Sequence, residues 1–381
     1  MRFGFALGLL FLAAFEAANV YFIMPMPGSQ RMRSLELAYL LYGWRWIVRG
    51  VAVGLVVLGV RRAWQRGVRA RVAMVGGVAA VAAMTYAFNF VMAADAMFRM
   101  PTVLTLVPAA RNAVALDRLV VGVEVNGEAR AYPLQFIGYH HQVRDSIGGM
   151  EVLVTYCTVC RTGRVFDPRI AARVEHFRLV GMDHFNAMLE DETTGSWWRQ
   201  ANGEAVAGPL RGTTLAELPS RQVTLRQWLA LYPASLVMQP DPAFTAQYAE
   251  DYAFERGTSR ARLTGTDPRS WEEKSWVVGL RVGGAARAYD WNQLLRQRAI
   301  NDTLGGRPVV LAVAGDSASF YAFVRPDTAT RFTVEGDSLR GGSATFAFNG
   351  RGPGGVLEAL VASQEFWHSW RTFNPGTGQF R

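Results

Sequence analysis

Three long apolar stretches at the front of the chain restrict its fold more than any other feature. They span roughly residues 3–24, 37–60 and 72–94, and each could cross about 30 Å of hydrocarbon as a helix. We therefore expect an N-terminal anchor of three transmembrane helices over residues 1–97, in contact with the lipid bilayer. The first stretch carries Glu16 and Asn19 and is followed by two more, so we expect it to be retained rather than cleaved as a signal peptide.

The basic residues of the chain predict how these helices are oriented. Residues 1–100 hold eleven arginines against three acidic residues, which accounts for most of the formal charge of +9. Five arginines lie between the second and third stretches, in "RRAWQRGVRAR", and the positive-inside rule places that loop in the cytoplasm. The chain after about residue 97 is then expected outside the cell membrane, in the periplasm where there is an outer membrane. This later part is nearly neutral, so we expect no nucleic-acid binding.

Arg45 and Arg49 lie one helical turn apart inside the second stretch, and charge within a membrane is costly unless it is paired. Glu16 of the first stretch lies at a similar predicted depth, so an intramembrane ion pair with these arginines is one interpretation. In the other, the membrane begins later, near Trp46, and the arginines extend to the interface. The sequence leaves both open.

The rest of the chain predicts a β-rich domain with an internal repeat. Residues 119–132 alternate around Asn126-Gly127, a strong signal for a β-hairpin. The segment "VVGVEVNGEARAYPLQFIGYHHQVRDSIGG" from Val120 aligns with "VVGLRVGGAARAYDWNQLLRQRAINDTLGG" from Val277, with twelve identities in thirty positions. We therefore expect two related halves, residues 101–265 and 266–381, with mostly β and some α structure.

The only two cysteines lie in the first half, in "VTYCTVCRTGRVFD", residues 154–167. In the repeat alignment the second half has Ala314 and Ser317 at the positions of Cys157 and Cys160, and it also lacks a histidine at the position of His140. The joint loss of three reactive groups predicts that they share a site, and that the second half is scaffold.

Thiol chemistry is the first hypothesis for this site. An oxidising compartment favours disulfide formation, and Cys157 and Cys160 can close a small disulfide ring. The positive charges of Arg161 and Arg164 are expected to lower a thiol pKa and favour exchange. His140 is expected to transfer a proton or to orient the pair, and a membrane redox complex is a candidate partner.

Two alternatives remain open. The first is a soft-metal site, most plausibly for copper, formed by Cys157, Cys160 and His140 with Met182 or His184 as a fourth ligand. Structural zinc is not expected, because no second Cys or His pair is present at close spacing. The second alternative is an accessory subunit of a membrane complex, with a static disulfide and contacts through the three helices. No cofactor, substrate or oligomeric state follows from the sequence.

From about Pro101 onward the chain resembles the family known as domain of unknown function 3179. The resemblance rests on "VVGVEVNGEARAYPL", "DSIGG", "VTYCTVCRTGRVFD", "TTGSWW", "GEAVAGPLRGTTLAELP" and the terminal "EFWHSWRTFNP". It implies an extracytoplasmic domain with a Cys-x-x-Cys motif after a strand, which some relatives carry with selenocysteine, and this favours redox chemistry. His140 corresponds to the family's histidine, whereas His141 stands where relatives often have an acidic residue. We interpret His368, in the aromatic tail, as structural.

Overall fold

The computed structural model describes residues 4–32 and 34–381, and their packing forms two units. The helical unit consists of Met1–Arg99, Phe177–Arg199 and Ala205–Thr213. The β-rich unit consists of Met100–His176, Gln200–Glu204 and Thr214–Arg381. The boundaries predicted from the repeat place residues 177–199 in the first half of the outer domain, whereas in the structure they pack with the helices.

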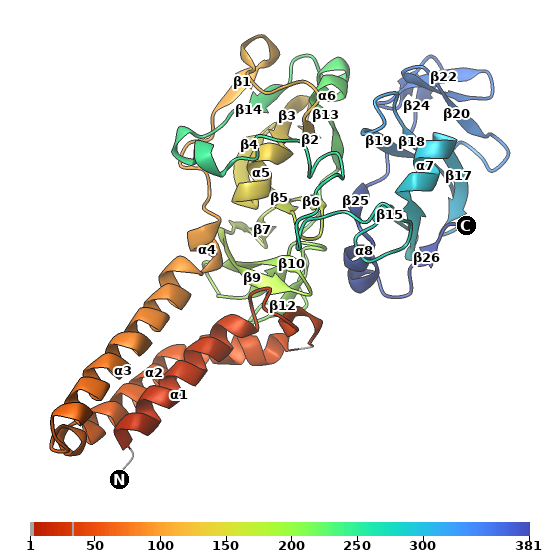
Figure 1. Ribbon diagram of the computed structural model, residues 1–381. Helices are drawn as coiled ribbons and strands as arrows, with labels where there is room; N and C mark the ends of the chain where they lie inside the picture. Colours follow the sequence, from red (N-terminus) through yellow and green to blue (C-terminus); the bar gives the residue numbers. More distant parts are fainter. Residues whose placement is uncertain (1–3, 33) are drawn as a thin grey trace. The chain divides into compact units, whose positions relative to one another are not determined.

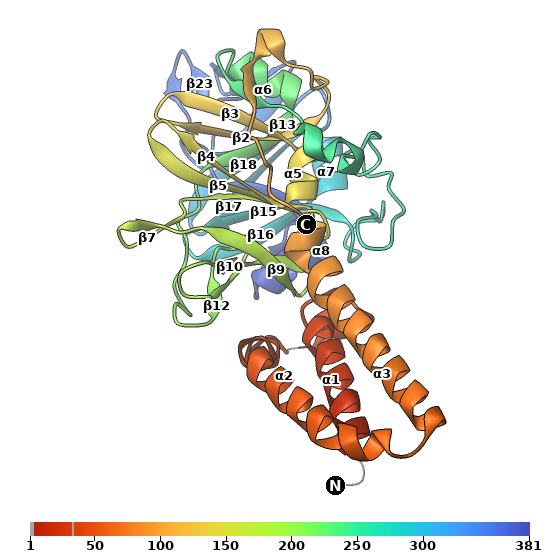
Figure 2. The same ribbon diagram turned by 90° about the vertical axis from the view of Figure 1, so that its left-hand side faces the viewer.

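The three apolar helices are confirmed. They are α1 (Gly4–Tyr21), α2 (Leu35–Trp64) and α3 (Val68–Tyr86), and α3 continues as a π-helical turn, η2 (Ala87–Val91), before the short α4 (Ala94–Met97). A short 3-10 helix, η1 (Ser29–Arg31), connects α1 to α2. The two views in Figures 1 and 2 show α1, α2 and α3 side by side. Each is long and apolar enough to cross a membrane.

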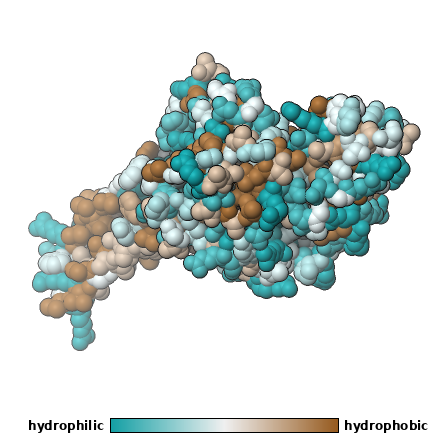
Figure 3. Space-filling view, turned by 90° about the horizontal axis from the view of Figure 1, so that it is seen from above, coloured by the Kyte–Doolittle hydropathy of each residue, from teal (hydrophilic) through white to brown (hydrophobic). Residues whose placement is uncertain are grey.

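A small antiparallel sheet completes the helical unit. Its strands are β9 (Phe177–Asp183), β10 (Asn186–Asp191), β11 (Trp197–Arg199) and β12 (Ala205–Ala207). The first turns of α2 pack on it, because the rings of Tyr39 and Tyr42 lie 5.0 and 5.3 Å from the ring of Trp197. One face of the N-terminal end of α2 is therefore covered by protein, whereas Leu37 and Leu40 at the same end are exposed. Further along α2 many apolar side chains are exposed, and Figure 3 shows the hydrophobic surface of the helices.

The first half of the β-rich unit begins with the predicted hairpin. Asn126 and Gly127 both have positive φ, 51° and 85°, as the tight turn between two twisted strands requires. The elements are β1 (Leu106–Pro108), η3 (Ala109–Arg111), β2 (Leu119–Val125), β3 (Glu128–Pro133), α5 (Leu134–His140), β4 (Gln142–Ile147), β5 (Met150–Cys157), β6 (Thr162–Phe166), β7 (Arg169–Ile170), β8 (Arg173–Val174), β13 (Ser220–Thr224), α6 (Leu225–Leu231), β14 (Leu236–Met238) and η4 (Pro242–Gln247).

The second half follows a similar course. Its elements are β15 (Trp276–Val282), β16 (Ala285–Asp290), α7 (Trp291–Gln297), β17 (Ala299–Leu304), β18 (Arg307–Val313), β19 (Phe320–Val324), β20 (Phe332–Glu335), β21 (Ser338–Gly341), β22 (Ala344–Ala347), β23 (Arg351–Gly352), β24 (Gly355–Val356), β25 (Ala362–Phe366), α8 (Trp367–Phe373) and β26 (Gly378–Gln379).

The two halves share strand order and local packing. One sheet has the order β14-β3-β2-β13 after its edge strand β1, and the other has the order β26-β16-β15-β25. Gly122 and Gly279, equivalent in the sequence repeat, each lie under a tryptophan ring, Trp228 in the first half and Trp370 in the second. Tyr132 donates a hydrogen bond to Asp145 in the first half, and Tyr289 donates one to Asp302 in the second. The main buried cluster includes residues of both halves.

Candidate functional site

The two cysteines lie at the tip of the hairpin formed by β5 and β6. Cys157 pairs with Thr162 in the ladder, so residues 158–161 form the closing loop. Arg161, the last loop residue, has a φ of 58°, a left-handed conformation that is uncommon for a side chain of its kind. Contacts with distant segments must therefore hold the loop in shape.

Arg161 provides many of these contacts. Its buried guanidinium donates to the backbone oxygens of Phe254 and Glu255, over 2.9 and 3.1 Å, and stacks on the ring of Trp276 at 3.6 Å. Burial lowers the pKa of Arg161, while Tyr156 and Glu255 oppose this effect. Because its donors bind backbone oxygens and a side-chain amide, Arg161 anchors the loop to the rest of the domain.

The two thiols face each other in a buried site. Cys157 and Cys160 have no exposed surface, and both are present as thiols. Burial is the main cause that raises the pKa of Cys160, and the hydrogen bond with Cys157 and its charge raise it further, whereas a hydrogen bond with Ser369 lowers it. This direction is opposite to the one expected from the flanking arginines. Desolvation is the largest cause because the thiolate has lost its water, and neither arginine is among the main causes of the shift.

Residues of the second half cover the cysteine loop. The amide of Phe366 donates to the carbonyl oxygen of Cys160 over 3.0 Å, and the ammonium of Lys274 donates to that of Val159 over 2.9 Å. His368 Nε2 lies 3.3 Å from the same Val159 oxygen. Burial, helped by the charge of Lys274, lowers the pKa of His368 to about 3. The second half thus forms part of the site and is more than a scaffold for the first.

Glu365 connects this cover to Arg164. Its carboxylate accepts hydrogen bonds from Ser369 at 2.8 Å and from Arg164 at 2.6 Å. Arg164 also donates to Glu217 over 2.9 Å, and the side chains of Arg164 and Glu365 are only 3% and 2% exposed. A buried ion pair of this kind is costly to break. Arg164 therefore stabilises the Glu365 carboxylate, which contacts Cys160 through Ser369.

His140 lies at the end of α5 in an aromatic cage. Its Nε2 is 2.8 Å from the hydroxyl of Tyr248, and its ring meets that of Phe244 edge-on. The amide of Tyr156, next to Cys157, donates to the carbonyl oxygen of His141 over 2.9 Å. The end of α5 is therefore tied to the end of β5, one residue before the first cysteine.

The residues of the predicted metal site are not gathered in one unit. Cys157, Cys160 and His140 belong to the β-rich unit, whereas Met182 and His184 belong to the helical unit. His184 lies 2.6 Å from the carboxylate of its neighbour in the chain, Asp183. Within residues 4–32 and 34–381, no three histidine, cysteine, aspartate or glutamate side chains lie close enough to hold a metal ion.

The helical unit contains a buried polar cluster. Glu16 has no exposed surface and accepts two hydrogen bonds from Arg49, at 2.7 and 2.9 Å. Asn89, within the π-helical turn, bonds to both side chains. Arg45 instead donates to the carbonyl oxygen of Tyr42. One of the two predicted partners of Glu16 thus forms the ion pair.

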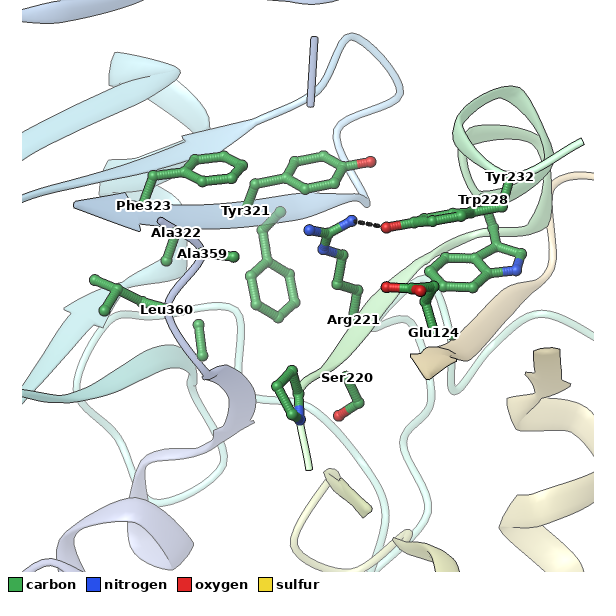
Figure 4. Close-up of a pocket in the computed structure, with 14 residues that line it drawn as sticks. Glu124, Ser220, Arg221, Trp228, Tyr232, Tyr321, Ala322, Phe323, Ala359 and Leu360 are labelled. Carbon is green, nitrogen blue, oxygen red and sulfur yellow. Dashed lines mark hydrogen bonds between the residues drawn. The ribbon is translucent and has the colours of Figure 1, made fainter. Parts of the chain in front are cut away.

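A small cavity of about 70 Å³ lies between the two halves of the β-rich unit, and Figure 4 shows its lining. Arg221 donates to the hydroxyl of Tyr232 over 2.8 Å beside the ring of Trp228. The cavity is large enough for a few water molecules. None of the site residues predicted from the sequence is among the residues that line it.

A family model described as protein of unknown function, DUF3179, matches residues 100–377. The chain belongs to the DUF3179 family. No curated protein and no solved structure matches it. The DUF3179 region contains the cysteine loop and every residue that covers it, and the three apolar helices precede it.

Sequence reasoning missed Lys274, Glu365 and Ser369 and interpreted His368 as purely structural. A signal was available in the DUF3179 region, because α6 and α8 share a pattern of tryptophan followed by proline five residues later: Trp228 with Pro233, and Trp370 with Pro375. The two helices also follow strands with similar places in their sheets, α6 after β13 and α8 after β25. The tryptophan–proline pattern does not by itself indicate that α8 packs against the cysteine loop.

Proposed function

We propose that this protein is a membrane-anchored thiol–disulfide redox protein whose couple is Cys157 and Cys160. The observation that carries the proposal is the pairing of the two thiols in one closed loop, where each is the other's neighbour and Ser369 contacts Cys160. The absence of both cysteines from the equivalent segment of the second half supports a dedicated use of the pair.

The proposed reaction is an exchange with a disulfide of a partner protein. Cys157 and Cys160 together lose two electrons and two protons and form one S–S bond, while the partner disulfide takes up both electrons and both protons and becomes two thiols. The exchange proceeds through a mixed disulfide, and the attacking group is a thiolate. The first step is therefore removal of a proton from a buried thiol.

Ser369 and Glu365 offer a route for that proton. Cys160 bonds to the Ser369 hydroxyl, which in turn donates to Glu365 Oε2 over 2.8 Å. Arg164 neutralises the Glu365 carboxylate, and Ser363 donates to its other oxygen over 2.7 Å. In the proposal His140 is a positioning residue that holds the end of α5 against the loop.

Burial limits how the pair reacts. Neither cysteine has exposed surface, so a partner sulfur reaches them only when the cover formed by α8 and Lys274 moves. A raised thiol pKa means that less thiolate forms at a given high pH. Because ionisation then stabilises the reduced state less, the disulfide is favoured relative to the two thiols. We expect a slow, reducing couple that reacts after a partner opens the cover.

Membrane insertion is the second part of the proposal. Exposed apolar side chains follow α2 from Leu37 to Trp64, and the part between the exposed Trp44 and Trp64 is about 30 Å long at about 1.5 Å per residue. Tryptophans at both ends suit the two interfaces. The arginine-rich segment 61–71, where α2 ends and α3 begins, is then cytoplasmic, and the β-rich unit is extracytoplasmic, where a disulfide persists.

We further propose that the β-rich unit arose from two related halves. The identical order of the four strands in the two sheets, and the glycine–tryptophan contacts of Gly122 and Gly279, support this origin. The second half then lost its own site and kept the role of covering the site of the first.

The test is a thiol count on the full-length protein, extracted from membranes in mild detergent without chelator. Two thiols that appear together only after reduction support the couple, and the Cys157→Ser variant should then show one thiol under all conditions. Stoichiometric copper that is lost in this variant would favour a metal site. Unchanged function in the Cys157→Ser/Cys160→Ser variant, measured as growth of cells that depend on the protein, would favour an accessory subunit.

A further inference from the structure

A second site is present in the helical unit, far from the cysteines in the sequence. A cavity of about 390 Å³ opens among α1, α2, the π-helical turn, α4 and β9, a volume within the usual range for ligand pockets. Its lining includes apolar side chains such as Val20, Ile23 and Val180. It also includes polar side chains, and three polar features have no explanation among the described residues.

The first two are buried polar atoms. Asn19 is 6% exposed and lines the cavity, yet its Oδ1 has no hydrogen-bond partner among the described residues. The hydroxyl of Thr85, on the same cavity wall, is also buried and unsatisfied there. Buried polar groups in folded proteins are nearly always paired, so two such atoms on one cavity indicate a missing partner.

The third feature is the charge of Arg45. The cavity also contacts Arg49 and Arg178, but Arg49 is paired with Glu16 at 2.7 Å, and Arg178 is paired with Asp95 at 2.9 Å and with Glu190 at 2.6 Å. Among the described residues, the guanidinium of Arg45 contacts Tyr42: it donates to the carbonyl oxygen of Tyr42 and lies over the Tyr42 ring. It has no carboxylate within 4.0 Å among the described residues and retains donors for an anion.

The position of the cavity along α2 defines the class of ligand. Arg45 and Trp46 lie in the first half of α2, where Trp44 and Trp46 are both exposed, and exposed tryptophans mark the headgroup level of a bilayer. An occupant at this level has an anionic polar part and apolar chains. A free anion would leave the wall of Val20, Ile23 and Val180 without a partner.

We propose that this cavity binds the phosphate-bearing headgroup of a membrane phospholipid, with Arg45 paired to the phosphate, Asn19 Oδ1 accepting a hydrogen bond from a headgroup hydroxyl, and the Thr85 hydroxyl bonded to a headgroup oxygen. The site rests on the membrane insertion proposed above and is independent of the cysteine chemistry. The π-helical turn fits this role, because such turns are frequent at functional sites, and here it positions Asn89 to accept a hydrogen bond from Arg49.

The test is native mass spectrometry of the full-length protein in detergent, titrated with phosphatidylglycerol. We expect Arg45→Gln to weaken binding about tenfold, as expected for loss of one charge-assisted contact. The matched control is Arg69→Gln, at an exposed position in the first turn of α3, which should bind as the wild type does. Equal binding by wild type and Arg45→Gln, or an equal loss in the two variants, would overturn the proposal.

Two further measurements separate the remaining explanations. Asn19→Leu fills the position with an apolar side chain, so the protein should fold and bind less phosphatidylglycerol; unchanged lipid binding by this variant contradicts the site. Inorganic phosphate should fail to displace the lipid at equal concentration, and displacement would show a free-anion site instead. A protein that leaves the membrane fraction in alkaline carbonate would refute membrane insertion itself, whatever its thiols do.

Discussion

The carbonyl oxygen of Cys160 accepts a hydrogen bond from the amide of Phe366, at the start of the last helix of the chain, over 3.0 Å. This bond joins the loop that carries both cysteines to the second half of the β-rich unit. Ser369, one helical turn into α8, then contacts the Cys160 thiol, and Glu365 contacts Ser369. The reactivity of the pair is therefore set by residues of both halves.

The raised pKa of Cys160 predicts how stability depends on pH. A raised folded-state pKa stabilises the reduced protein below the unfolded thiol pKa of about 8.5, and this contribution is lost as the pH rises above that value. The free energy of unfolding of the reduced protein should fall between pH 8.5 and 10.5 by more than that of Cys160→Ser, as measured by urea unfolding. Equal slopes for the two proteins would contradict the burial argument.

Ser369 provides a test of the proton route. Ser369→Ala removes the bond that lowers the Cys160 pKa, so iodoacetamide should modify Cys160 several-fold more slowly at pH 8 than in the wild type. Ser369→Thr keeps a hydroxyl and should restore the rate, which a purely structural role would not require. Alkylation is followed by mass spectrometry, and an unchanged rate in Ser369→Ala would exclude the route.

His368 should affect stability in acid. Its pKa is lowered to about 3, so the folded state holds it neutral, and stability falls as the pH drops from about 6.5 toward the folded value. His368→Gln removes this term, and its loss of stability between pH 6.5 and 4 should be smaller than that of the wild type. Thermal unfolding at several pH values measures the pH dependence of stability for both proteins. If stability falls equally with pH in the wild type and in His368→Gln, His368 is charged in the folded state.

The buried pair of Arg164 and Glu365 should be strongly coupled. Arg164→Met leaves the carboxylate without its charged partner and is expected to cost about 3–5 kcal/mol. The Arg164→Met/Glu365→Gln variant removes both charges and should be more stable than Arg164→Met alone. A double-mutant cycle by urea unfolding gives the coupling energy, and additive effects would mean that the two charges act independently.

The glycine–tryptophan contact of the second half should not tolerate a methyl group. A Cβ at position 279 would lie 2.1 Å from the ring of Trp370, so Gly279→Ala should lower the free energy of unfolding by about 1–3 kcal/mol. Gly315→Ala is the matched control, because its nearest contact would be an ordinary 3.7 Å. Equal effects of the two substitutions would show that Trp370 adapts.

Features set by local sequence could be predicted. The three apolar helices follow from runs of hydrophobic residues, and the hairpin at Asn126-Gly127 follows from the turn conformation that this pair favours. Thr224 is the N-cap residue of α6, and its hydroxyl accepts a bond from the amide of Gln227, as threonine side chains often do at this position. Each of these structures depends on residues that are adjacent in the chain.

The surroundings of the cysteines could not be predicted in the same way. Arg161 and Arg164 flank the pair in the sequence, but their side chains bind Phe254, Glu255, Glu217 and Glu365. The thiols instead meet Ser369 and the cover from the second half. Desolvation of a thiol depends on the whole tertiary structure. The direction of the thiol pKa shift therefore could not be predicted from the neighbouring residues in the sequence.

The most direct test of the proposed couple is a redox titration of Cys157 and Cys160 in the full-length detergent-solubilised protein. The protein is equilibrated with mixtures of reduced and oxidised dithiothreitol, free thiols are alkylated after unfolding, and the mass is measured. The account predicts a single two-electron transition in which both thiols disappear together, and none in Cys157→Ser. Two thiols that remain free under every oxidising mixture would contradict a redox role for the pair.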